Sequence, residues 1–233
     1  MYNIIKIKQK VTNKQPKSDY YSQEHNINFN LWIDYWFQQD LIFKTGSKSI
    51  LEIGKGTGMF GTIMEKRGFK YTSADIDKNL NPDIIYDVTK IPIKDNSYDC
   101  VCAFQVLEHI PFSKLKKGLL ELRRVSKKYI IISLPYACFY ISFAFQPFYA
   151  TFFDPIFNFF RLKPFEPIYV NFYIPFFFLK KLGTIKPHFW EMGRSGLSIS
   201  KIREIINNSG LEIESEKSRI FYPYHHFFVL KKV

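Results

Sequence analysis

The sequence predicts an α/β fold with a seven-stranded, mostly parallel sheet, helices on both faces and an antiparallel last strand. Short apolar runs alternate with segments of helical periodicity along most of the chain, a pattern that favours βαβ units. A glycine-rich turn directly follows the first apolar run. The length of 233 residues suits a single domain, residues 1–233, that carries one insertion.

The first expected element is an amphipathic helix ahead of the sheet. The apolar residues that set its helical spacing are Phe29, Trp32, Ile33, Trp36, Phe37 and Phe43. Five strands then follow, over residues 50–53, 69–74, 84–86, 98–104 and 129–134. Two helices connect them, over residues 57–67 and 113–125.

The end of the chain predicts one more helix and two more strands. Residues 198–209 form a helix that begins at a serine cap and ends before Gly210. The strands are expected over residues 211–220 and 225–230. Because only a short turn joins these two strands, they should pair antiparallel.

Charge and cysteine content limit the compartment and the partners. Lysine and arginine number 33 against 21 acids, a balance that favours acidic partners. Cys100, Cys102 and Cys138 form no CxxC pair, so neither a disulfide framework nor a zinc site is expected from them. Residues 1–18 are polar and basic, which predicts a flexible arm and excludes a secretory signal. A cytoplasmic protein is expected, with peripheral membrane contact as an option.

The chain is organised around a glycine turn between a strand and a helix. The strand carries one acid, Glu52, and Gly54, Gly56 and Gly58 follow at every second position. Glycine lets the backbone turn tightly and lets a ligand approach closely. The next helix presents unpaired N–H groups and the positive end of its dipole. This arrangement is a Rossmann-like nucleotide cradle.

Acidic residues end the next two strands, at Asp75 and Asp87. Ligands of open α/β sheets bind beyond these strand ends, where one carboxylate can accept hydrogen bonds from ribose hydroxyls and another from an adenine amino group. Two cofactors fit the glycines. Residues 56–61 satisfy GxGxxG, the dinucleotide pattern, with Asp75 about 20 residues later as that pattern requires. Residues 52–58 satisfy the acid-GxGxG pattern of S-adenosylmethionine enzymes.

Two downstream segments distinguish these cofactors by resemblance. Residues 91–101, IPIKDNSYDCV, and residues 104–110, FQVLEHI, resemble the LPxxxxSFDxVxxxxxLEH signature of a large subgroup of class I S-adenosylmethionine-dependent methyltransferases. With the glycine turn and Asp75, the resemblance covers about residues 48–135. Lys55 departs from the family, which often has cysteine there, at a position that contacts the cofactor mainly through its backbone.

The resemblance implies S-adenosylmethionine as cofactor and S-adenosylhomocysteine as product, and no metal is expected. Glu52 and the glycines would hold the methionine moiety, and Asp75 the ribose hydroxyls. Asp87 and Val88 would bind the adenine amino edge. The implied cofactor-binding residues are Glu52, Gly54, Lys55, Gly56, Gly58, Asp75, Ile76, Asp87, Val88 and Gln105. The resemblance also implies that Ile76 packs on the adenine ring and that Gln105 lies beside the sulfonium.

Methyl transfer from a sulfonium depends mainly on positioning the nucleophile, and a base is needed only for a neutral hydroxyl or a protonated amine. The candidate catalytic residues are His109, His188 and Glu191. The candidate substrate-binding residues are Trp190, Arg194 and Tyr136. Structural roles stay open for both sets: a helix cap at His109 and a hydrogen-bonded turn over residues 188–194.

An aromatic insertion follows the fifth strand. Residues 136–190 hold 21 of the 43 aromatic residues, and prolines interrupt them. The uncharged run over residues 129–153 is therefore not expected to span a membrane, although it is long enough. Short helical pieces are expected to cap the site, over residues 136–146, 148–160 and 171–182. The apolar-then-basic segment 176–181 suits an anionic membrane surface, a lipid-linked acceptor or a homodimer contact.

Three functions stay open at this point. The first is a methyltransferase that acts on a small-molecule or lipid-linked acceptor under the aromatic cap. The second is an NAD(P)-binding oxidoreductase, and the third is a non-catalytic methyltransferase-like module that binds a membrane or a partner. Nucleic acid is a disfavoured partner, because the aromatic residues of the insertion are not interleaved with arginine and lysine as in a base-stacking groove.

Overall fold

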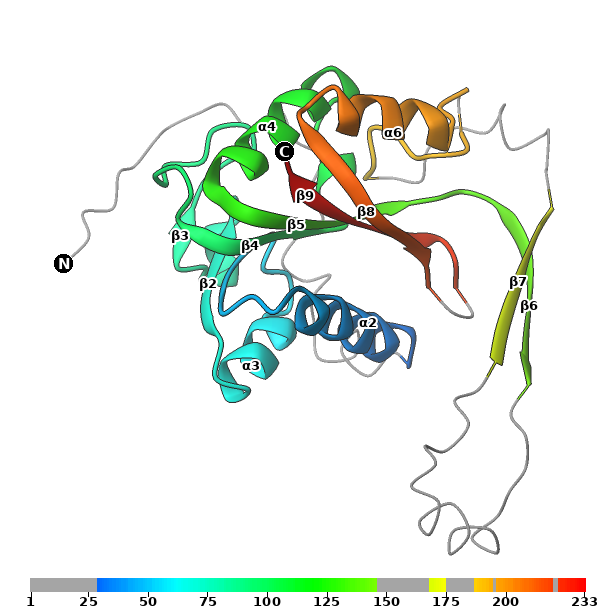
Figure 1. The fold of residues 1–233 in the computed structure, drawn as a ribbon, viewed down its shortest axis with the longest axis horizontal. Helices are drawn as coiled ribbons and strands as arrows, with labels where there is room; N and C mark the ends of the chain where they lie inside the picture. The colour runs from blue at the N-terminus through cyan, green and yellow to red at the C-terminus, as the bar shows by residue number, and fades with distance from the viewer. Residues whose placement is uncertain (1–28, 146–167, 175–186, 195, 220–221) are drawn as a thin grey trace, which may run out of the picture.

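The computed structural model describes residues 29–145, 168–174, 187–194, 196–219 and 222–233. Its main element is a seven-stranded sheet in the order β3-β2-β1-β4-β5-β9-β8 (Figure 1). The strands are β1 Ser49–Ile53, β2 Lys70–Asp75, β3 Ile84–Ile85, β4 Tyr98–Phe104, β5 Ser126–Pro135, β8 Leu211–Ser218 and β9 His225–Lys232. The first five are parallel, and β9 runs antiparallel to both β5 and β8. The predicted fold class is confirmed.

Helices cover both faces of this sheet (Figure 1). On one face lie α2 Phe29–Thr45 and α3 Met59–Lys66, and on the other α4 Leu115–Val125 and α6 Ile199–Asn207. Successive side chains of a strand point to opposite faces. In β4, Cys100 and Cys102 therefore pack in the core under α2 and α3, while Val101 and Ala103 pack in the core under α4 and α6. The two thiols are buried and free, as small apolar residues would be.

Helix α2 lies where the periodicity predicts it, but four of the six apolar residues that predict it are exposed, whereas Phe37 is buried. Phe29, Trp32, Trp36 and Phe43 are between 46% and 71% exposed; we call this stripe the outer face of α2. The buried face consists of Asp34, Tyr35, Phe37, Gln38, Leu41 and Ile42. Apolar residues occur all around this helix, so their spacing does not identify the side that meets the sheet.

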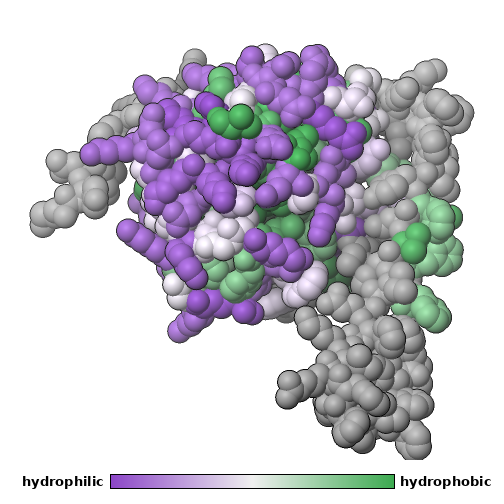
Figure 2. Space-filling view, viewed as in Figure 1, coloured by the Kyte–Doolittle hydropathy of each residue, from purple (hydrophilic) through white to green (hydrophobic). Residues whose placement is uncertain are grey.

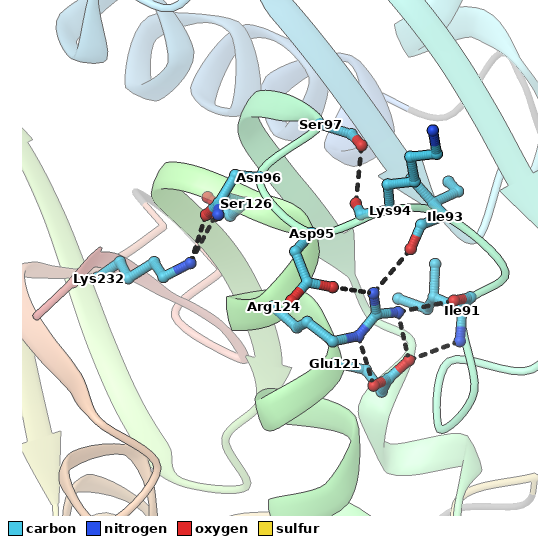
Figure 3. A network of polar contacts seen from close by, with 10 residues as sticks. All are labelled: Ile91, Ile93, Lys94, Asp95, Asn96, Ser97, Glu121, Arg124, Ser126 and Lys232. Carbon is cyan, nitrogen blue, oxygen red and sulfur yellow. Dashed lines mark hydrogen bonds and ion pairs between the residues drawn. The ribbon is translucent and has the colours of Figure 1, made fainter.

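Arg124, in the last turn of α4, holds the loop that precedes β4 against this helix by hydrogen bonds (Figure 3). Its guanidinium donates to both carboxylate oxygens of Glu121 at 2.9 Å and to Asp95 Oδ1 at 2.7 Å. It also donates to the carbonyl oxygens of Ile91 and Ile93, each at 2.7 Å. This loop connects the cavity-lining segment after β3 to β4, so the Arg124 contacts hold one wall of the site.

The aromatic insertion contains strands where helices were expected. Strands β6 Phe139–Phe145 and β7 Ile168–Ile174 pair antiparallel as a separate two-stranded sheet (Figure 1). The prediction of helical pieces over residues 136–146 and 171–182 is therefore wrong for the parts that these strands occupy. Aromatic and β-branched residues favour strands, and an all-apolar run does not reveal which period it follows. The predicted piece 148–160, the cap as a whole and the basic arm 1–18 include residues outside those described.

One face of the β6–β7 ribbon is apolar and exposed. The register pairs Ile141 with Phe172 and Phe143 with Val170, which places these side chains on the same face. The exposed residues of this ribbon face are Phe139, Ile141, Phe143, Phe145, Val170 and Phe172. In Figure 2 they form the hydrophobic patch at the right margin of the molecule. Among the described residues, none of the helices has the length and apolar character needed to cross a bilayer.

Candidate active site

A cavity of about 690 Å³ lies beyond the carboxyl ends of β1, β2 and β4, where this topology predicts a ligand site. The predicted cofactor residues that line it are Glu52, Gly54, Lys55, Gly56, Asp75, Ile76, Asp87, Val88 and Gln105. Gly58 does not line the cavity. It lies at the N-cap of α3 with φ +76°, so it shapes the turn. The structure thus brings nine of the ten residues together.

The first glycine of the turn cannot be replaced without strain. Gly54 has φ +83°, a conformation that costs other residues energy. A Cβ atom there would lie 2.4 Å from Val106 Cγ2. The backbone N–H of Gly54 donates to the carbonyl of Ala74 at 2.7 Å, which ties the turn to β2. The glycine therefore keeps the β1 end and the loop after β4 in close contact around the cavity.

Glu52 lies in the floor of the cavity and is buried. The hydroxyl of Tyr71 donates to its Oε2. Burial raises the pKa of Glu52 to about 8, and burial together with the nearby Glu52 charge raises the pKa of Tyr71. At neutral pH the carboxyl group of Glu52 therefore retains a proton in the chain without ligand.

The two acids at the strand ends are held by their own local turns. Asp75 Oδ1 accepts from the backbone N–H of Asp77 at 2.9 Å, and Asp87 Oδ1 accepts from that of Thr89 at 2.8 Å. Burial raises the pKa of Asp75, and hydrogen bonds from backbone N–H groups, Asp77 first, oppose that rise. Both residues line the cavity, and these bonds fix one oxygen of each carboxyl group.

Gln105 follows β4 in a strained conformation, with φ +54° although it is not glycine. With its amide nitrogen facing Glu108, Gln105 donates to Glu108 Oε1 at 3.3 Å and accepts from the backbone of Leu134 and the hydroxyl of Ser133. These hydrogen bonds hold the side chain beside Glu108, which belongs to the next group of polar residues.

That group, which we call the histidine cluster, comprises Glu108, His109, His188 and Glu191. The rings of His109 and His188 lie edge to face, with centroids 5.0 Å apart, and both line the cavity. His188 Nδ1 is 3.0 Å from Glu191 Oε1, and Glu191 Oε2 is 2.7 Å from Arg194 Nε. The structure therefore brings together all three predicted catalytic residues, with Glu191 behind His188.

The three predicted substrate-binding residues lie outside the cavity lining. Trp190 is buried, packs against Phe112 and donates its indole N–H to the carbonyl of Ile110 at 3.0 Å. Arg194 pairs with Glu191, and the Tyr136 ring packs against His226. These positions give Trp190 and Tyr136 packing roles and place Arg194 behind the histidine cluster.

Two groups of residues that line the cavity were not predicted from the sequence motifs. The inner face of α2 contributes Leu31, Asp34, Tyr35 and Gln38. The loop between β8 and β9 and the start of β9 contribute Tyr222, Tyr224 and His225. Asp34 joins the two groups, because its Oδ2 lies 2.8 Å from Arg219 Nη1 and 2.9 Å from His225 Nδ1. An aspartate in a helix rich in apolar residues is the one sequence signal that points to this wall.

The residues present fit a nucleoside cofactor. The cavity begins at a turn in which Gly54 has no room for a side chain, and it continues past the carboxyl groups of Asp75 and Asp87. Carboxylates held at successive strand ends suit hydroxyl and amino donors. The family model described as a methyltransferase domain matches residues 30–141, the part of the chain that holds this turn and both acids.

Solved structures share the fold at low sequence identity. An S-adenosylmethionine-dependent methyltransferase from Aquifex aeolicus aligns with a TM-score of 0.57 and 14% identity, over 94% of this chain and 100% of that one. Magnesium protoporphyrin IX methyltransferase from Synechocystis, solved with bound S-adenosylhomocysteine, aligns with a TM-score of 0.51 and 14% identity, over 93% and 97%. No curated protein sequence matches the chain. The family match over residues 30–141, on this fold and around this cavity, identifies this part of the chain as a methyltransferase domain that is similar to the class I S-adenosylmethionine-dependent methyltransferases.

Proposed function

We propose that the chain transfers a methyl group from S-adenosylmethionine, bound along the glycine turn, to a small-molecule or lipid-linked acceptor that meets it at the histidine cluster. One observation carries this proposal: a single cavity joins the glycine turn to His109 and His188. The donor and the acceptor would thus meet inside one enclosure, as an in-line transfer requires.

The donor end is assigned to the residues that line the cavity near β1 and β2. Glu52, Gly54 and Gly56 hold the methionine part, Asp75 accepts from the ribose hydroxyls, and Asp87 accepts from the adenine amino group. Lys55, Ile76, Val88 and Gln105 complete the wall, with Ile76 against the adenine ring. When bound, S-adenosylmethionine supplies a methyl group on a positively charged sulfur.

The acceptor end is assigned to His109 and His188, with Tyr224 beside them. Glu191 holds His188 through Nδ1 at 3.0 Å and thereby fixes the direction of its ring. In this proposal His109 and His188 act on the nucleophilic atom of the acceptor, and Glu191 is a positioning residue.

A lipid-linked acceptor is supported by two exposed apolar surfaces, the ribbon face of β6–β7 and the outer face of α2. Exposed aromatic patches of this kind occur on surfaces that meet membranes or other proteins. The net charge of +12 favours an anionic membrane over a neutral one. A second copy of the chain is the other occupant that could cover these faces. Measurements of vesicle binding and of oligomeric state distinguish a membrane from a second copy.

The test is methyl transfer from S-adenosylmethionine labelled on the methyl group. The purified chain is incubated with the lipid extract and, separately, with the low-molecular-weight aqueous fraction of cells. We expect label in one of these fractions and none with Asp75→Ala. Label found only in protein or nucleic acid, or equal label with Asp75→Ala, contradicts the proposal.

A further inference from the structure

We propose that Glu108, His109 and His188 form a binding site for a divalent transition-metal ion at the acceptor end of the cavity. Each of these residues offers one ligand atom, and the three atoms lie within 4.8 Å of one another. His109 and His188 also line the cavity, so an ion held by them would face the space assigned to the acceptor. The site itself is independent of the proposed function, but its role in methyl transfer rests on that function.

The first argument is a buried carboxyl group with one oxygen that lacks a hydrogen-bond partner. Glu108 is fully buried, and its Oε2 has no hydrogen-bond partner among the described residues. Its Oε1 lies 4.0 Å from His109 Nε2. A buried carboxyl oxygen without a hydrogen-bond partner is costly, and Glu191, whose side chain is also fully buried, adds a second acid nearby. Arg194 pairs with Glu191, so a cation bound at Glu108 would supply the partner that Oε2 lacks.

The second argument concerns the orientation of His188. Its Nδ1 lies 3.0 Å from Glu191 Oε1, a distance at which a protonated Nδ1 donates to the carboxylate. This bond selects the tautomer in which Nε2 carries a lone pair. Metal-ligating histidines almost always make such a bond from the second ring nitrogen to a carboxylate, a carbonyl group or water. Glu191 and Arg194 therefore form the supporting shell that a metal site needs.

The ligand set suggests which ions bind. Two imidazole nitrogens and one carboxylate oxygen form the protein ligands of catalytic zinc sites and of the facial triad that binds iron(II). Metal–ligand bonds of about 2.1 Å place tetrahedral donors about 3.4 Å apart. Binding would thus draw the three donors together by up to about 1.4 Å from their present separation of at most 4.8 Å.

Three protein ligands leave coordination positions open, which gives the site a chemical role. A hydroxyl group bound there would lose its proton more readily, as metal-bound water does. The hydroxyl proton would pass to solvent, the oxygen–methyl bond would form as the sulfur–methyl bond breaks, and the bonding pair would stay on sulfur. The inference thus specifies the acceptor as a hydroxyl compound and the reaction as O-methylation.

The experiment measures metal binding without relying on turnover. The full chain is stripped with chelator and titrated with Zn²⁺ by calorimetry and with Co²⁺ by visible absorption. We expect about one ion per chain, with visible Co²⁺ bands. His109→Ala and His188→Ala should lose binding by about 100-fold or more, and Glu191→Gln should weaken it roughly 10-fold to 100-fold. Circular dichroism checks that each variant is folded.

His225→Gln is the matched control. His225 also lines the cavity and also pairs with a buried acid, Asp34, but it lies outside the cluster. It should bind Zn²⁺ and Co²⁺ as the wild type does. No binding by the wild type, or equal binding by His109→Ala and His188→Ala, overturns the metal site. S-adenosylhomocysteine titrated into the same stripped samples reports on the donor site separately: if it binds and the metal does not, only the metal inference fails.

Discussion

Glu52 is a carboxyl group on the floor of the donor site, and folding changes its proton affinity. Its pKa rises from 4.5 to about 8 because burial removes it from water. The hydrogen bond from Tyr71 opposes this rise but does not cancel it. Sequence alone indicates an acid inside an apolar strand, whereas the raised pKa depends on the helices that bury it.

This shift predicts how pH affects stability. A raised pKa means that the folded chain keeps a proton that the unfolded chain releases, so the stabilisation is complete below pH 4.5 and is lost as pH rises through about 8. Glu52→Gln lacks this loss. Between about pH 5 and pH 9, the free energy of unfolding of the variant relative to wild type should rise by about 4 kcal/mol. Urea unfolding at both pH values measures it, and a pH-independent difference contradicts the assignment.

Two glycines with the same φ angle allow the cost of backbone strain to be measured separately from the cost of a steric clash at Cβ. Gly54 and Gly68 both have φ +83°, but a Cβ atom would meet Val106 at Gly54 and nothing within 4 Å at Gly68. Gly68→Ala should cost about 1–2 kcal/mol, the price of the left-handed conformation. Gly54→Ala should cost about 1–3 kcal/mol more, because it also overpacks. Equal losses in urea unfolding would show that the contact with Val106 relaxes freely.

At the scale of elements, Arg124 connects α4 to the loop before β4 through three loop residues, Ile91, Ile93 and Asp95 (Figure 3). Arg124→Ala should lower the free energy of unfolding by about 2 kcal/mol, since it removes charge-assisted hydrogen bonds and leaves two carbonyl groups without their donor. Arg124→Lys should recover less than half of this loss, because an ammonium group cannot reproduce the planar fork. If urea unfolding shows that Arg124→Lys recovers all of the lost free energy of unfolding, the stabilisation by Arg124 depends on its charge alone.

The helices and strands also show which parts of the fold can be predicted from short stretches of sequence. The central strands are continuous apolar runs that end in glycine or an acid, so Ile50 to Ile53 and Tyr98 to Phe104 could be placed within one residue of the observed strands. The cofactor half of the site follows, because Asp75 ends β2 and Asp87 lies two residues beyond β3. The side of α2 that packs and the strands of the insertion could not be predicted, since their residues are apolar in every direction.

The acceptor half of the site depends on the assembled molecule. Asp34 from α2, Tyr224 from the loop before β9 and His188 from the end of the insertion line one cavity only when the sheet is complete. The seclusion of Glu108 likewise results from packing by segments far away in the chain. Short sequence motifs carry no information on contacts between distant segments. For this reason Trp190 and Tyr136 were predicted to bind substrate, whereas in the structure their rings pack against Phe112 and His226.

At the scale of the whole molecule, the exposed ribbon face predicts membrane binding. Sedimentation with anionic vesicles should capture the wild type, and a double variant, Phe143→Ser with Phe172→Ser, should bind about 10-fold more weakly, because two partly inserted rings are lost. Leu120→Ser is the control, since Leu120 is exposed on α4, away from the ribbon. Equal binding by the double variant would assign the ribbon face to a protein contact.

The central claim is that the glycine turn and the strand-end acids hold S-adenosylmethionine, and calorimetric titration with S-adenosylhomocysteine tests it most directly. We expect one site per chain. Asp75→Ala should weaken binding about 10-fold to 100-fold, the worth of hydrogen bonds to a charged group. Asp40→Ala, which removes a surface acid paired with Lys44 on α2, should leave it unchanged. Binding of NAD(H) in place of S-adenosylhomocysteine, or wild-type affinity in Asp75→Ala, would contradict the account.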